Sequence, residues 1–170
     1  NLDQVLVLVA AEPEFSHSQL ARALVAAEQA GIRSLIGLNK QDVVPAFDKA
    51  WARLQPYRDM AYPVLPLSLR NTADGLKGLR EQLQNRTTLV LGPSGAGKST
   101  LINRLVPQAN AATNDISKAL HSGKHTTTST TWYWVDADKT TALLDSPGFQ
   151  EFGLHHIPAS ELAKCMPDIH

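Results

Sequence analysis

The sequence is poor in cysteine, because Cys165 is the only one among 170 residues. A lone cysteine cannot form an internal disulfide, and it cannot supply the cysteine spacing of a zinc site. A disulfide framework of the kind found in small secreted proteins is therefore excluded. We expect a reducing, cytoplasmic setting.

Net charge and long hydrophobic runs are also lacking. The 16 Lys and Arg residues balance the 16 Asp and Glu residues, and 43% of the chain is hydrophobic. This ordinary globular composition demands neither disorder nor a broad polyanion-binding surface. The apolar run at residues 5–11 is too short to cross a bilayer and has no basic leader, so it predicts a buried strand and no membrane association. The length predicts one compact domain, and the start at Asn1 without methionine leads us to expect a piece of a longer protein.

What the sequence does contain is a regular alternation of strand and helix patterns. Apolar runs that predict buried strands occupy residues 4–10, 34–38, 63–68 and 87–92. Helical patterns follow these runs, beginning near Ser16, Pro45, Leu76 and Lys98. Such alternation predicts an α/β fold in which helices cover both faces of a mostly parallel sheet.

The second half of the chain has a different pattern. Periodicity fails from about residue 109 to residue 128, and a compact domain tolerates so long a loop mainly when the loop is functional. Residues 130–135 and 140–144 then predict an antiparallel strand pair. Trp132 and Trp134 share one face of the first of these strands, and we expect them to pack under a helix or a neighbouring domain rather than to stack on bases.

A phosphate loop is predicted at residues 92–99, where "GPSGAGKS" matches G-x-x-x-x-G-K-[ST] between an apolar strand and a helix. Its glycines let backbone N–H groups surround phosphate oxygens, and the helix N-terminus adds its dipole. Lys98 would place a charge between the outer phosphates, and the Ser99 hydroxyl would bind Mg²⁺. The residues expected to contact the nucleotide here are Gly92, Pro93, Ser94, Gly95, Ala96, Gly97, Lys98, Ser99 and Thr100.

A base-recognition motif is predicted at residues 39–42, "NKQD". Guanine presents two adjacent N–H donors that the Asp42 carboxylate can accept together, whereas adenine offers no such pair. Asn39 can bridge loop segments, and the stem of Lys40 can lie over the base. N-K-x-D alone is a weak signal, but its place after a parallel strand in a chain with a phosphate loop favours a guanine site.

Two further segments fit the γ-phosphate and Mg²⁺. In "DSPG" at residues 145–148, Asp145 can hold Mg²⁺ through water, and the N–H of Gly148 can approach a γ-phosphate. "GKHTTT" at residues 123–128 ends the long loop, and either Thr126 or Thr127 is placed to complete the Mg²⁺ coordination.

On the stretches "NLDQVLVLVA", "NKQD", "GPSGAGKST", "GKHTTT" and "DSPGFQEFGL", the chain resembles circularly permuted GTPases, and more narrowly the ribosome-small-subunit-dependent GTPase family. The resemblance covers essentially the whole chain. It implies a three-layer P-loop NTPase fold in the permuted order of base-recognition motif, phosphate loop and D-x-x-G. It also implies a GTPase domain at residues 1–157 and a helical linker at residues 158–170. The family's N-terminal oligonucleotide-binding barrel and C-terminal zinc module would lie outside this sequence.

The same resemblance implies a GTP hydrolase that acts as a switch in maturation of the small ribosomal subunit. Slow intrinsic turnover would be stimulated by the subunit. GTP or GDP and Mg²⁺ would bind here, and zinc only in the module outside this sequence. The implied partners are the small subunit and its rRNA, and the chain would be monomeric.

The resemblance also bears on individual residues. Ser68 is expected to contact the base through its loop backbone, although "SLR" at residues 68–70 departs from the frequent S-A-K. Phe149 follows D-x-x-G and cannot orient water by hydrogen bonding, so His125 is the expected water-positioning residue. The expected catalytic residues are Lys98, His125 and Thr127.

Three other functions stay open at this point. One is a permuted GTPase of large-subunit assembly, although such proteins usually carry asparagine where this chain has Gly95. Another is a nucleotide-binding regulatory module with little turnover. An ATP-using kinase is opposed by Asp42 and by the lack of a recognisable acceptor site.

Overall fold

The computed structural model describes residues 2–70, 75–93, 95–109 and 131–145. Six strands form one sheet in the order β3-β2-β1-β4-β6-β5. All neighbouring strands are parallel except β5 and β6, which are antiparallel. The strands are β1 Gln4–Ala10, β2 Arg33–Asn39, β3 Val64–Pro66, β4 Thr87–Leu91, β5 Thr131–Trp134 and β6 Ala142–Asp145.

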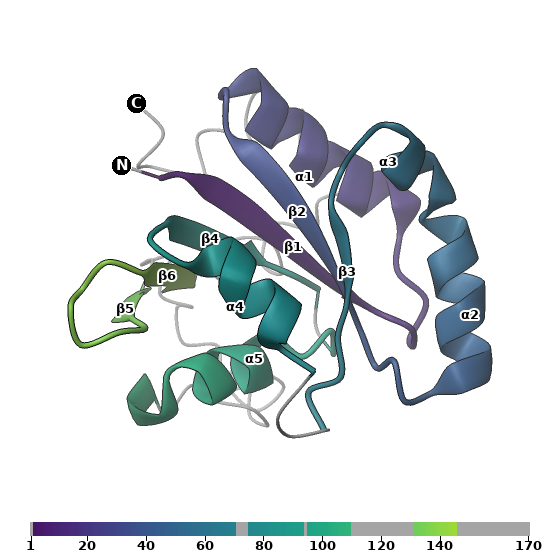
Figure 1. Cartoon of the computed structure of the whole chain (residues 1–170). Coiled ribbons are helices and arrows are strands. Elements are labelled where there is room, and N and C mark those ends of the chain that lie inside the picture. Colours follow the sequence, from purple (N-terminus) through teal and green to yellow (C-terminus); the bar gives the residue numbers. More distant parts are fainter. Residues whose placement is uncertain (1, 71–74, 94, 110–130, 146–170) are drawn as a thin grey trace, which may run out of the picture.

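Helices cover both faces of this sheet. Figure 1 shows α1, α2 and α3 on one side and α4 and α5 on the other. The helices are α1 His17–Gln29, α2 Val44–Arg53, α3 Gln55–Asp59, α4 Lys77–Leu83 and α5 Lys98–Leu105, followed by the 3₁₀ turn η1 Pro107–Ala109. The predicted three-layer α/β fold with a mostly parallel sheet is therefore confirmed.

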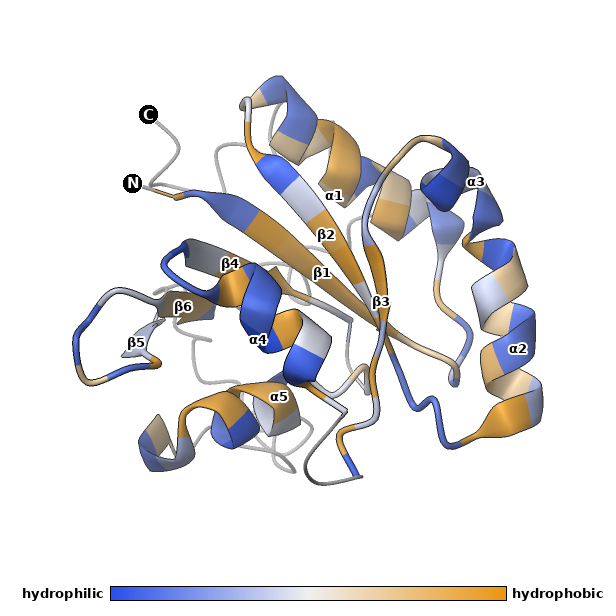
Figure 2. Ribbon diagram, viewed as in Figure 1, coloured by the Kyte–Doolittle hydropathy of each residue, from blue (hydrophilic) through white to orange (hydrophobic). Residues whose placement is uncertain are grey.

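Strand β1 forms the centre of the fold, because it pairs with β2 on one side and β4 on the other. All of its residues are buried. Val5, Val7 and Val9 pack with the helices α1 to α3, whereas Leu6 and Leu8 pack with α4 and α5. Figure 2 shows the hydrophobic strands enclosed between helices whose hydrophilic residues alternate with hydrophobic ones. A strand buried on both faces explains the continuous apolar run in the sequence.

The ends of α1 and α2 follow from local sequence. Ser16 caps α1, since its Oγ accepts a hydrogen bond from the Gln19 backbone N–H at 3.3 Å. Pro45 lies in the first turn of α2, where a missing N–H costs nothing. The helical pattern of Phe47, Trp51 and Leu54 predicts one helix through Leu54, but α2 ends at Arg53. A second short helix then begins at Gln55 with Pro56 in its first turn.

Three sequence-based expectations about the strands differ from the structure. The strand expected at 63–68 is only Val64–Pro66. The last strand begins at Ala142, because the Asp136 carboxylate accepts hydrogen bonds from the N–H groups of Thr140 and Thr141 and holds both in the preceding turn. Trp132 and Trp134 do not pack under a helix of the part of the chain that the structure describes, since these side chains are 43% and 41% exposed on the edge strand β5. Their packing beneath a neighbouring domain stays a prediction.

The topology places several motifs together. Parallel strands direct all their carboxyl ends to one edge of the sheet, where α/β folds bind ligands. The segments after β2, β3 and β4 therefore lie at the same edge as Asp145, the last residue of β6. Across the ranges described, no helix has the length and apolar character needed to span a bilayer.

Candidate nucleotide-binding site

The base-recognition motif is joined to the phosphate loop by the side chain of Asn39. This side chain is buried, and its Nδ2 donates a hydrogen bond to the Ala96 carbonyl at 3.0 Å. Its Oδ1 accepts hydrogen bonds from the backbone N–H groups of Lys40, at 2.7 Å, and Leu69, at 3.4 Å. One amide thus connects three segments that are distant in sequence.

Ser68 lies against Asp42, the last residue of the base-recognition motif. Ser68 is 3% exposed, and its Oγ donates a hydrogen bond to Oδ1 of Asp42 at 3.2 Å. Asp42 itself lies at the surface, where a ligand can reach its carboxylate. The Gln41 N–H donates to the Leu67 carbonyl at 3.0 Å, which ties the motif to residues 67–70, hereafter the Ser68 loop.

Lys40 lies between these motifs and the segment after β1. Its backbone has a φ of 71°, in the left-handed region, and its Nζ donates to the Glu12 carbonyl at 2.6 Å. The side chain is half-buried. The ammonium group is therefore held at one end while the aliphatic stem remains available beside the motif.

Two glycines of the phosphate loop are required by close backbone approach. A Cβ on Gly92 would stand 2.8 Å from the Leu8 carbonyl oxygen, and a Cβ on Gly97 would stand 2.6 Å from Nδ2 of Asn39. Gly97 also has a φ of 99°, which side chains rarely adopt. The phosphate loop thus packs directly on the base-recognition motif, and only glycine fits at the contact.

The phosphate loop is connected to the D-x-x-G segment by an ion pair. Lys98 Nζ lies 2.9 Å from Oδ1 of Asp145, and the two side chains are only 8% and 23% exposed. Burial, and secondly the negative charge of Asp145, raises the pKa of the Tyr133 hydroxyl on the neighbouring strand. Lys98 and Asp145 are therefore both largely shielded from water, as is needed in a site for phosphate and Mg²⁺.

The oxygen donors here fit Mg²⁺. Ser99 follows Lys98 in the first turn of α5, and Asp145 ends β6. Mg²⁺ commonly takes only one or two protein oxygens and completes its shell with phosphate and water. The described ranges contain no group of three or more His, Cys, Asp or Glu residues that could hold a metal by themselves.

The structure brings together the sequence-predicted residues Asn39, Lys40, Asp42, Ser68, Gly92, Ala96, Gly97, Lys98 and Asp145 through the contacts above. Pro93 and Gly95 belong to the same loop, and Ser99 and Thr100 to the first turn of α5. Five predicted site residues lie outside the described residues: Ser94, His125, Thr126, Thr127 and Gly148.

Two contacts of this site have no motif in the sequence. The Glu12 carbonyl holds Lys40, and the Arg104 guanidinium donates through Nη1 to the Leu69 carbonyl. Both acceptors are backbone groups, so residue type gives no signal of their role. Such contacts become visible only when the packing of distant segments is known.

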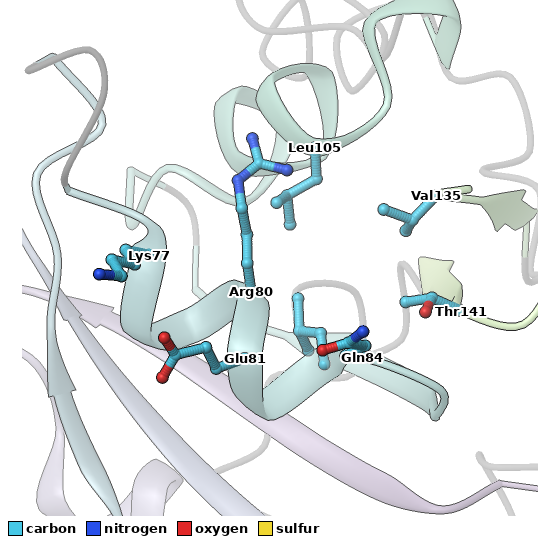
Figure 3. Close-up of a pocket in the computed structure, with 8 residues that line it drawn as sticks. Lys77, Arg80, Glu81, Gln84, Leu105, Val135 and Thr141 are labelled. Atoms are coloured by element: carbon cyan, nitrogen blue, oxygen red, sulfur yellow. The ribbon is translucent and has the colours of Figure 1, made fainter. Parts of the chain in front are cut away.

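A separate cavity of about 400 Å³ lies between α4, α5 and the β5–β6 hairpin (Figure 3). Its lining residues are Lys77, Arg80, Glu81, Leu83, Gln84, Leu105, Val135 and Thr141. Gln84 and Thr141 precede β4 and β6, so the cavity reaches the sheet edge opposite the phosphate loop. Of the predicted nucleotide-binding residues that the structure describes, none lines it.

Comparison with known proteins agrees with this geometry. The family model described as RsgA GTPase matches residues 1–155. A protein of Variovorax paradoxus named small ribosomal subunit biogenesis GTPase RsgA is 62% identical over 170 residues, which cover 99% of this chain and 54% of that protein. A protein of the same name from Paraburkholderia xenovorans is 50% identical over 172 residues, with the same coverage. The chain thus spans about half the length of these curated relatives.

Two solved structures are similar over most of the chain. YjeQ from Thermotoga maritima has a TM-score of 0.63 and 27% identity, with 88% of this chain and 49% of that chain covered. YloQ, described as a circularly permuted GTPase, has a TM-score of 0.59 and 26% identity, with coverage of 99% and 52%. The permuted order of motifs predicted from the sequence therefore has a structural counterpart.

Proposed function

This chain belongs to the RsgA GTPase family, and from that premise we propose that it binds and hydrolyses GTP as a switch in maturation of the small ribosomal subunit. The observation that carries the proposal is the Asn39 side chain, which connects the base-recognition motif, the phosphate loop and the Ser68 loop. A base and its phosphates can then be bound by a single site. The names of the relatives support the small subunit as the partner.

Guanine is recognised by the Asp42 carboxylate in this proposal. The carboxylate accepts hydrogen bonds from the guanine N1–H and the N2 amine. The Ser68 hydroxyl donates a hydrogen bond to Oδ1 of Asp42 and so fixes the orientation of the carboxylate. The backbone of the Ser68 loop contacts the same base. Lys40 lays its stem over the ring while Glu12 holds its ammonium group.

The phosphates are bound by the phosphate loop. Backbone N–H groups of residues 92–99 donate to phosphate oxygens, and Lys98 turns from Asp145 to the β- and γ-phosphates. Ser99 and Asp145, with Thr126 or Thr127, would hold Mg²⁺. When bound, Mg²⁺ neutralises charge that develops on the phosphate oxygens. Gly148 donates its N–H to the γ-phosphate and so senses whether it is present.

Hydrolysis is slow in this proposal because Phe149 follows D-x-x-G and cannot orient water. His125 takes that role, and contact with the small subunit and its rRNA accelerates the step. The protein acts in the cytoplasm as a monomer.

Phosphate release by the chain tests the proposal when it is measured alone, with purified small subunits and with purified large subunits. We expect slow turnover of GTP and not ATP, raised only weakly by small subunits because this chain spans about half of its relatives. Stimulation by large subunits alone would instead favour the large-subunit assembly function. GTP binding with no turnover under any condition would favour a regulatory module.

A further inference from the structure

Leu69 is the residue at which the Ser68 loop contacts the rest of the site. Its N–H donates to Oδ1 of Asn39 at 3.4 Å. Its side chain is buried, with Cδ1 only 3.0 Å from the position of a Cβ on Gly97. Its carbonyl accepts a hydrogen bond from Nη1 of Arg104. The position of Leu69 therefore depends on the base-recognition motif, the phosphate loop and α5 together.

The Ser68 loop has little regular structure to hold it. Strand β3 ends at Pro66, and the last ladder-like bonds are Leu67 N–H to the Leu38 carbonyl and Gln41 N–H to the Leu67 carbonyl. Beyond Leu67 the backbone leaves the sheet, so its polar groups need partners elsewhere. The Leu69 carbonyl accepts a hydrogen bond from the charged guanidinium of Arg104, which is 35 residues away in sequence.

Arg104 belongs to the helix that also carries the phosphate-binding lysine. Helix α5 begins at Lys98, and Arg104 lies in its last turn. A rigid helix between these residues, about 9 Å long at 1.5 Å per residue, fixes the Leu69 carbonyl relative to the phosphate loop. A shift of Leu69 would also move Ser68, which hydrogen-bonds to Asp42.

We propose that Arg104 is a positioning residue for guanine recognition: it holds the Leu69 carbonyl and so keeps Ser68 and Asp42 in register with the phosphate loop. This inference rests on the proposed function, since it concerns the same guanine site. A simpler role is available, because a cation in the last turn of a helix is favourable to the helix dipole. That role predicts lower stability without a change in base preference, and the two roles therefore differ in a measurable way.

The experiment measures the affinities of GDP and ADP by competition against a fluorescent GDP analogue. ADP carries the same sugar and phosphates without the guanine donor pair, so the ratio of the two affinities reports base recognition. Arg104→Met keeps the aliphatic stem and removes the donor. A lost charge-assisted hydrogen bond should lower the GDP preference about tenfold, through weaker GDP binding with ADP binding unchanged.

Two further variants separate positioning from general stability. Arg104→Lys retains one charged donor for the Leu69 carbonyl and should keep the GDP preference. Arg86→Met is the matched control, because half-buried Arg86 also donates through Nη1 to a carbonyl, that of Gln82 at 2.8 Å, near the opposite edge of the sheet. It should lose stability without losing GDP preference.

The outcomes distinguish this inference from the function on which it rests. A wild-type chain without GDP preference would contradict both. A wild-type preference that Arg104→Met retains, or equal weakening of GDP and ADP, would overturn the role of Arg104 alone. Should Arg104→Met fail to fold, Arg104→Gln carries the same expectation, because its amide is too short to replace the guanidinium.

Discussion

The base side and the phosphate side of this site are built from different interactions. On the base side, Asp42 is exposed and is oriented by one neutral donor, the Ser68 hydroxyl. On the phosphate side, Lys98 is almost fully buried and lies 2.9 Å from the Asp145 carboxylate. In the proposed function, the first arrangement would select a ligand by its hydrogen-bond pattern and the second would select it by charge.

Because of this difference, the two sides should respond differently to substitution. The Ser68 hydroxyl donates to a charged carboxylate, and such a hydrogen bond contributes roughly 1.5 to 3 kcal/mol. Asp42 is exposed and its carboxylate can be hydrated instead, so the base side should change specificity with little loss of fold. Breaking a buried ion pair leaves an unpaired charge and costs about 3 to 5 kcal/mol. The phosphate side should therefore be more sensitive in both catalysis and stability. Asn39 and Gly97, where the two sides touch, should affect both.

The largest change, in the preference between GTP and XTP, is expected from Asp42→Asn on the base side. The amide would turn an N–H toward the guanine N2 amine, donor against donor, but could donate to the carbonyl of xanthine. Lost hydrogen-bond complementarity can change discrimination by as much as about 10⁴-fold. Competition between GTP and XTP should show the preference moving toward XTP. Asp48→Asn, an exposed control on α2, should leave it unchanged, and an unchanged GTP preference in Asp42→Asn would remove Asp42 from the site.

Lys98→Ala tests the phosphate side. Removing one preorganised charge from the transferred phosphoryl group should slow GTP hydrolysis about 100-fold to 1000-fold. Single-turnover phosphate release measures this loss, and circular dichroism confirms folding, since Asp145 loses its partner. Lys49→Ala is the matched control, because Lys49, which lies on α2, forms an exposed ion pair with Glu14. Equal rates for the wild type and Lys98→Ala would refute the phosphate-loop assignment.

Gly97→Ala tests the contact at which the two sides meet. A left-handed alanine costs about 1 to 2 kcal/mol at both Gly97 and Gly31, which have φ values of 99° and 72°. Only at Gly97 does the new Cβ meet Asn39, whereas nothing lies within 4 Å of one at Gly31. Displacing the Asn39 bonds should weaken GDP about tenfold in Gly97→Ala alone. Titration calorimetry measures both affinities, and equal losses would mean that Asn39 does not couple the sides.

The smallest effect is expected away from both sides, at His17. Burial, and secondly the Arg53 charge, lowers the pKa of His17 below its ordinary value of 6.5. The unfolded chain therefore binds this proton more readily, so the stability that His17 contributes should be lost as pH decreases below 6.5 and should be constant above it. Thermal melting should show a flatter pH dependence in His17→Phe, with unchanged GDP preference. An identical slope in both proteins would contradict the shift.

The sequence predicts the fold well where patterns are local. The apolar runs at residues 4–10 and 87–92 match β1 and β4, and the motif spacing identifies the phosphate loop and the base-recognition motif. The residue at which a strand begins and the position of a strand in the sheet cannot be predicted from local patterns in the same way. Asp136 captures Thr140 and Thr141 through side-chain bonds that compete with the strand, and the edge position of β5 exposes both tryptophans.

The contacts that organise the site were less predictable than its motifs. The sequence predicts that Asn39 bridges loop segments. It does not show which segments, because the partners at Ala96 and Leu69 are backbone atoms, which every residue type provides. The contact between Arg104 and Leu69 has the same character. These contacts depend on how α5 packs beside the end of β3, which is a tertiary property.

In the proposed function, the two sides, separated in sequence and in permuted order, bind one nucleotide. The structure of this chain with GDP and Mg²⁺ tests it most directly. We predict the guanine edge against the Asp42 carboxylate and the β-phosphate within hydrogen-bond distance of Lys98 Nζ, now turned from Asp145. A base bound away from Asp42, for instance in the cavity beside Arg80 and Leu105, would contradict the account even if the phosphates lay in the phosphate loop.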